Sequence, residues 1–182
     1  MSEGWISKED LAAWHEAGHA LVAWNFGLKL HTVTLDAVPA GTMRTRIAPM
    51  VETCELTKPK LVATMREVER HVVFRLAGVI GELLRTQKEH AARYGLASPQ
   101  RLSRKWLMKL RTCDEPDLDF AYATVFAWLS GKSDPEPTLV SLWGRTERLL
   151  REPKNRWRLT QLAERLMKVR QMTGEEIQTL FA

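Results

Sequence analysis

The stretch that decides the fold of this chain is SKEDLAAWHEAGHALVAWNFG, residues 7–27. Ser7 is followed three residues later by Asp10, a capping pair typical of a helix N-terminus. Apolar residues then recur at the spacing of one helix face, and Gly27 stands where a C-terminal cap is expected. These features predict a helix from about Lys8 to Phe26.

The predicted helix carries the motif His-Glu-Ala-Gly-His at residues 15–19. His15 and His19 are about one turn apart, so both imidazoles project from one face and can bind a single Zn²⁺. Glu16 lies about 100° round the helix, where it can act on a water as general base and then as general acid. The alternative is a helix with two structural or exposed histidines. Gly18, which is costly inside a helix, indicates that another backbone comes close.

The rest of the chain predicts a mainly α (α+β) fold with a small β element after the first helix. Leu30–Leu35 alternates and contains β-branched residues, which predicts a strand, and Thr45–Ala48 predicts a second short strand. Further helices are expected at about Pro59–Tyr94, Ser98–Arg111, Asp117–Leu129, Thr138–Arg151, Trp157–Gln171, and after a cap at Thr173. We predict a single domain over residues 1–182, with a C-terminal helical part from about residue 135.

Composition limits the class of protein. The 182 residues are 45% hydrophobic and 27% charged, with a net charge of +5, which is ordinary for a globular chain. Cys54 and Cys113 stand far apart, so no disulfide framework is expected. Without a signal peptide or a long apolar run, the sequence predicts a cytoplasmic chain with no membrane span.

Basic residues gather between Arg101 and Arg111 on one of the predicted helices. Such a face is usually solvated, but it leaves a basic nucleic-acid-binding module as an alternative function. The strand at Leu30–Leu35 also has two interpretations. It is either an exposed edge that binds the backbone of a substrate or an ordinary packed strand.

Residues His15–Val22, His-Glu-Ala-Gly-His-Ala-Leu-Val, resemble the peptidase domain of the FtsH family, the membrane-bound ATP-dependent zinc proteases. Other segments resemble the same family in the same order: Val33–Leu35 with the turn Pro39–Thr42, Leu76–Leu83, Asp119–Thr124, and Leu162–Ile177. The resemblance implies a helical metallopeptidase domain that hydrolyses peptide bonds in a polypeptide substrate, with Zn²⁺ as cofactor.

In that family an aspartate on a later helix is the third zinc ligand. The Ala-Thr register of the resemblance puts this ligand at Asp119, and Asp117, which precedes leucine, is the competing candidate. Acidic residues in the first turn of a helix also complement its dipole, so either aspartate can be structural. The resemblance therefore implies that zinc is held by His15, His19 and Asp119, with Glu16 as the catalytic residue.

The chain also departs from the family pattern. Within these residues there is no Gly-x-x-x-x-Gly-Lys-Ser/Thr phosphate loop and no membrane anchor, and Val79 stands where the family has arginine. Glu82 is interpreted as a supporting residue rather than a ligand. We expect a small or unfolded polypeptide as substrate, or a separate ATPase or adaptor as partner. A catalytically inactive adaptor or regulatory binding protein that keeps the peptidase fold is the alternative.

Overall fold

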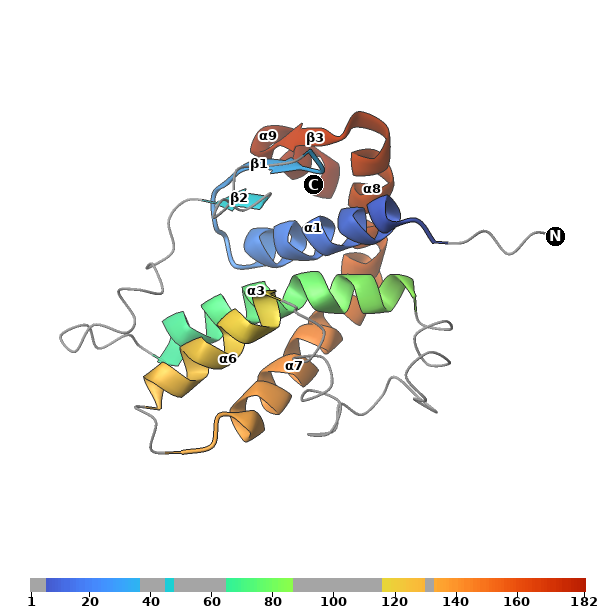
Figure 1. Cartoon of the computed structure of the whole chain (residues 1–182). Coiled ribbons are helices and arrows are strands. Elements are labelled where there is room, and N and C mark those ends of the chain that lie inside the picture. Colours follow the sequence, from blue (N-terminus) through green and yellow to red (C-terminus); the bar gives the residue numbers. More distant parts are fainter. Residues whose placement is uncertain (1–5, 37–44, 48–64, 87–115, 130–132) are drawn as a thin grey trace.

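Two helices lie side by side at the centre of the computed structural model, which describes residues 6–36, 45–47, 65–86, 116–129 and 133–182 (Figure 1). They are α1 (Lys8–Asn25) and α3 (Met65–Arg85). The described part is mainly helical, with a small antiparallel sheet beside α1, and the predicted fold class is confirmed.

Helix α1 forms where the sequence predicts it. The Ser7 hydroxyl accepts a hydrogen bond from the backbone N–H of Asp10 at 3.0 Å, which satisfies one of the free donors of the first turn. The chain leaves the helix through Gly27, whose φ of 67° is a left-handed conformation that favours glycine. Between these ends, residues 16–23 of α1 are all buried, so the helix is a central element of the core.

The backbones of α1 and α3 come into contact along their shared face. A Cβ atom on Gly18 would lie 2.2 Å from the carbonyl oxygen of Ala77, and one on Gly81 would lie 2.3 Å from that of Trp14. Neither position accepts a side chain without moving a helix backbone. The close approach expected from Gly18 is therefore confirmed, and it brings the inner faces of the two helices together beside the histidine pair.

The later helices pack around this central pair. Helices α6 and α7 lie against α3, while α8 lies against α1 and is followed by α9 (Figure 1). Their bounds are α6 Pro116–Trp128, α7 Glu136–Arg151, α8 Pro153–Val169 and α9 Gly174–Phe181. These helices, like α3, match predicted ones, whereas the predicted helix at 98–111 and the turn at 39–42 lie outside the described residues.

The small sheet has the strand order β2-β1-β3, with β1 (Leu30–Thr34) in the middle. Both neighbours, β2 (Thr45–Ile47) and β3 (Gln171–Thr173), are antiparallel to it, and Val33 pairs with Thr45 on one side and Met172 on the other. The interpretation of β1 as an exposed edge is therefore wrong, because both of its hydrogen-bonding sides are occupied.

Strand β3 was not expected from the sequence, because three residues are too few to show an alternating pattern. It joins the C-terminal segment to β1, and α9 begins directly after it. The predicted cap at Thr173 is confirmed as a full capping box with Glu176.

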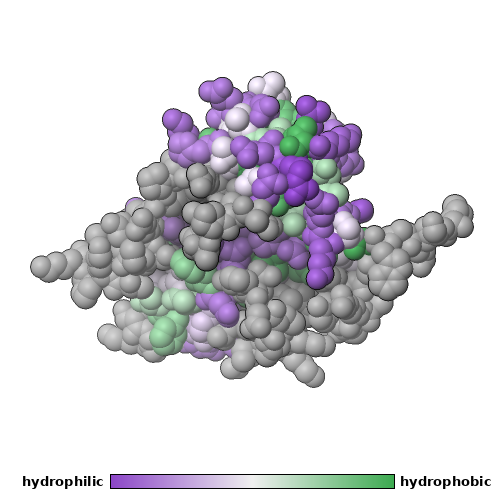
Figure 2. Space-filling model, turned by 45° about the horizontal axis from the view of Figure 1, so that its top comes forward, coloured by the Kyte–Doolittle hydropathy of each residue, from purple (hydrophilic) through white to green (hydrophobic). Residues whose placement is uncertain are grey.

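No helix in the described part of the chain is both long and apolar enough to cross a membrane. In Figure 2, hydrophilic side chains cover most of the coloured surface in the upper part of the view. The large hydrophobic side chains that are exposed among the described residues are Phe126, Trp157 and Val169.

Candidate metal centre

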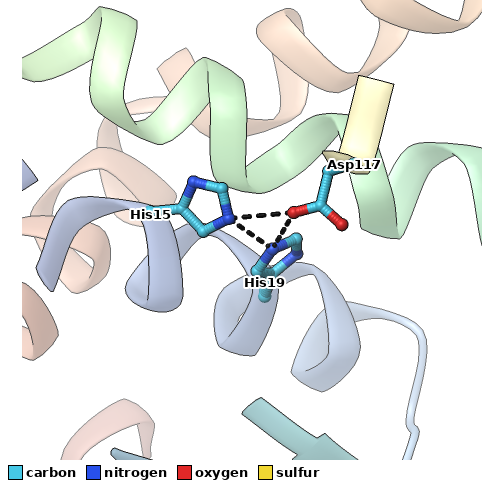
Figure 3. A group of neighbouring side chains, drawn as sticks. All are labelled: His15, His19 and Asp117. Atoms are coloured by element: carbon cyan, nitrogen blue, oxygen red, sulfur yellow. Dashed lines mark hydrogen bonds and ion pairs between the residues drawn. The ribbon is translucent and has the colours of Figure 1, made fainter. Parts of the chain in front are cut away.

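Three side chains converge where α1, α3 and the first turn of α6 meet (Figure 3). The Nε2 atoms of His15 and His19 are 3.0 Å apart, and they lie 2.9 and 3.0 Å from Oδ2 of Asp117. Donor atoms about 2.0–2.1 Å from a tetrahedral zinc ion lie roughly 3.3 Å from one another. The observed triangle is slightly smaller, so one ion fits if the donor atoms move apart by a few tenths of an ångström.

The second nitrogen of each imidazole is also held. Nδ1 of His15 lies 2.5 Å from Oε1 of Glu82, and Nδ1 of His19 lies 2.7 Å from the backbone carbonyl oxygen of Phe74. Because both partners are acceptors, each Nδ1 donates a hydrogen, and Nε2 is the nitrogen of each ring that faces Asp117 and would bind a metal. Glu82 thus supports His15, the kind of role that the family resemblance implies for it.

The Asp117 carboxylate divides its two oxygens between different partners. Oδ2 faces the imidazoles, while Oδ1 accepts a hydrogen bond of 2.7 Å from Nη1 of Arg75. The guanidinium of Arg75 also lies over the ring of Phe120, 4.3 Å from its centroid. The third donor atom is therefore oriented by a neighbouring helix as well as by its own.

The pKa values of His15 and Asp117 are both shifted in the site. Burial by itself lowers the pKa of His15, but hydrogen bonds to Asp117 and Glu82 outweigh it and hold that pKa well above 6.5. Burial raises the pKa of Asp117, yet His19 and His15 outweigh it and keep that pKa well below its usual range. Asp117 is therefore a carboxylate, the form that binds a cation.

No model of a known protein family matches this chain, and no curated protein matches it.

Asp119, the third ligand favoured by the sequence, is not part of the converging group; Asp117 is. Two residues along a helix correspond to about 200° of rotation, so the two carboxylates point to opposite sides of α6. Asp117 shares its face with the buried residues Ala121 and Thr124, whereas Asp119 is exposed. The buried face of α6 distinguishes the two aspartates, but apolar residues lie on all sides of this helix, so its sequence does not show which face is buried.

Glu16 follows His15 on α1 and is buried, with 7% of its surface exposed. The helix places its side chain about 100° from that of His15. Glu16 is therefore beside the histidine pair without being a member of the donor triangle.

Gly78 forms the wall of the site on the α3 side. A Cβ atom built on it would lie 2.5 Å from Nε2 of His19 and 2.6 Å from Nε2 of His15. These are the two nitrogens that face Asp117, so hydrogen is the only substituent that fits beside them. Nothing in the local sequence pattern connects Gly78 with the histidines.

Replacing Gly78 with alanine is expected to weaken zinc binding by about 10- to 100-fold. Both rings are held at Nδ1, so making room for the methyl group breaks a hydrogen bond of the kind worth about 1.5–3 kcal/mol when one partner is charged. Titration with a zinc-chelating dye measures the change. Gly144→Ala is the matched control, because its Cβ would have only the end of the Arg148 side chain nearby, at 3.7 Å. Unchanged affinity in the Gly78 variant would contradict the role given to this wall.

Proposed function

We propose that this chain is a zinc-dependent metalloendopeptidase of the type represented by the FtsH peptidase domain, with His15, His19 and Asp117 as zinc ligands. The observation that supports it is the convergence of two Nε2 atoms and one carboxylate oxygen within 3.0 Å of one another. Three protein ligands leave one position of a tetrahedral ion open, which is the pattern of catalytic zinc sites rather than structural ones.

The residues present fit the chemistry of peptide hydrolysis. When bound, zinc would supply Lewis-acid chemistry, polarising a peptide carbonyl and lowering the pKa of water to about 7. Glu16 accepts the proton of the attacking water and passes it to the departing amine. Glu82 and the Phe74 carbonyl keep the two histidine rings in the tautomer that a ligand needs.

The exposure of the ligands bears on the kind of substrate. The side chains of His15, His19 and Asp117 are 16%, 5% and 12% exposed. An extended polypeptide segment reaches so recessed a site more easily than the surface of a folded protein does. An unfolded polypeptide is therefore the proposed substrate, delivered where necessary by a separate ATPase or adaptor.

The metal is the first thing to test. The purified chain is expected to contain zinc and to cleave an unstructured protein such as casein. Cleavage should stop when a chelator removes the metal and return when zinc is added, because the Lewis acid is lost and then restored. Metal analysis and gel densitometry measure both, and circular dichroism of the chelated protein checks that the fold persists. Two histidines with one carboxylate also bind Fe(II), so restoration by iron alone would contradict zinc as the cofactor.

The alternatives are decided by the same experiment. A chain that holds zinc in the site but never cleaves would favour the inactive adaptor or regulatory protein. A basic nucleic-acid-binding module depends on Arg101–Arg111, which lie outside the described residues. No described contact favours either alternative over hydrolysis.

A further inference from the structure

Arg75 reaches from α3 to the first turn of α6 and contacts it at two points. Nη1 donates a hydrogen bond of 2.7 Å to Oδ1 of Asp117, and the guanidinium lies 4.3 Å from the centroid of the Phe120 ring. The two contacted residues are three positions apart, on adjacent turns of one helix. Together the two contacts hold both the carboxylate and the helix turn that carries it.

Asp117 needs such an anchor more than the two histidines do. His15 and His19 sit in the buried middle of α1, whereas Asp117 comes 102 residues after His15 and lies in the first turn of its helix. Helix ends fray, and a carboxylate there has two freely rotating bonds unless something holds it. The guanidinium of arginine is planar and rigid, so it restrains an acceptor with little further loss of freedom.

The orientation of Arg75 is dictated by these contacts at a cost to the side chain itself. Among the described residues, its Nε is buried and has no hydrogen-bond partner. A buried donor without a partner is unfavourable, and it persists where stronger contacts determine the position of the group. The bond to Asp117 and the contact with Phe120 are the contacts that determine it.

We infer that Arg75 is a positioning residue of the metal centre, which occupies one oxygen of Asp117 so that only the other faces the ion. This inference rests on the proposed zinc site and adds to it. With Oδ1 held by Arg75, Asp117 would offer Oδ2 alone to an ion, so its second oxygen would not compete with water or substrate. Without Arg75 the carboxylate is free to turn, either towards two-oxygen coordination or away from the site.

Arg75→Met tests this on the full chain, because methionine keeps most of the side-chain volume and removes the donor. Zinc affinity is expected to fall about 10- to 100-fold, the usual result of losing a group that orients a ligand. The visible absorption of the cobalt-substituted protein should change as well, because it reports coordination number and geometry. Arg75→Lys keeps the charge but not the planar group, and it should recover affinity only in part.

Arg145→Met is the matched control. Arg145 also donates to a carboxylate of a residue on α3, Glu69, at 2.7 Å, but it lies on α7 and its side chain is 59% exposed. It is not one of the residues that surround the metal centre. Its replacement should leave zinc affinity and the cobalt spectrum unchanged.

A second variant keeps the test decisive if Arg75→Met cannot be used. If Arg75→Met does not fold, as judged by circular dichroism, Phe120→Leu carries the test and should shift the cobalt spectrum in the same direction by less. The inference is overturned if the folded Arg75→Met variant keeps wild-type zinc affinity and an unchanged cobalt spectrum. The same result in Phe120→Leu overturns it where Arg75→Met does not fold. Either result leaves the proposed function intact. A wild-type chain that binds no zinc overturns the proposed function, and the inference with it.

Discussion

Replacing Glu16 with glutamine is expected to abolish cleavage of an unfolded protein while leaving zinc bound. Glutamine has nearly the same shape, so it suits the buried position next to His15, but it cannot accept a proton from water. General acid–base groups contribute about 10²- to 10⁴-fold to a rate, and a loss of that size is expected here. The initial rate of casein cleavage and the zinc content of the same preparation are the two measurements.

The control for this variant lies on the same helix. Glu9 is in the exposed first turn of α1, where it pairs with Arg170, and it is remote from the histidine pair. Glu9→Gln should cleave at the wild-type rate. If Glu16→Gln retained full activity with zinc present, Glu16 would not be the general base and the mechanism would have to be abandoned.

The second large effect is expected at Asp117. The zinc affinity of Asp117→Ala should fall by more than the roughly 10- to 100-fold that follows from removing a supporting group, because one of the three donor atoms is gone. Asp119→Ala should keep the wild-type zinc affinity, since the Asp119 side chain is exposed on the opposite side of α6. Zinc content after dialysis against a weak chelator distinguishes the two variants.

Asp117→Ala also leaves Arg75 without its carboxylate, so the stability of the fold has to be measured beside the metal content. Asp117→Asn keeps the shape and separates the two effects, because an amide oxygen is a much weaker ligand for zinc than a carboxylate. Zinc loss in Asp119→Ala together with zinc retention in Asp117→Ala would restore the ligand favoured by the sequence and contradict the observed geometry.

The first helix and the histidine pair on it can be predicted from the sequence because every signal there is local. The Ser7 cap, the apolar spacing and Gly27 act within a few turns, and the structure has the helix at Lys8–Asn25. His15 and His19 face the same way for the same reason, since one turn of helix relates them. Gly18 also predicts that another backbone comes close, because a glycine inside a helix is otherwise costly.

The third donor atom depends on tertiary structure. Asp117 and Asp119 are two residues apart, a small step in a motif match but about 200° round a helix, and only the packing of α6 on α3 decides which one faces α1. Strand β3 could not be predicted from the sequence either, because it is three residues long and pairs with residues 137 to 141 positions away in the chain.

By itself, then, the sequence determined a capped helix that presents two histidines and a glutamate in the pattern of a zinc site. The tertiary structure decided which aspartate joins them and which groups hold the donors in place: Glu82, the Phe74 carbonyl, Arg75 and the bare backbone of Gly78. The physical reason is the range of the interactions. Helix periodicity acts over one or two turns, whereas the contacts that complete the site join side chains 42 to 102 residues apart.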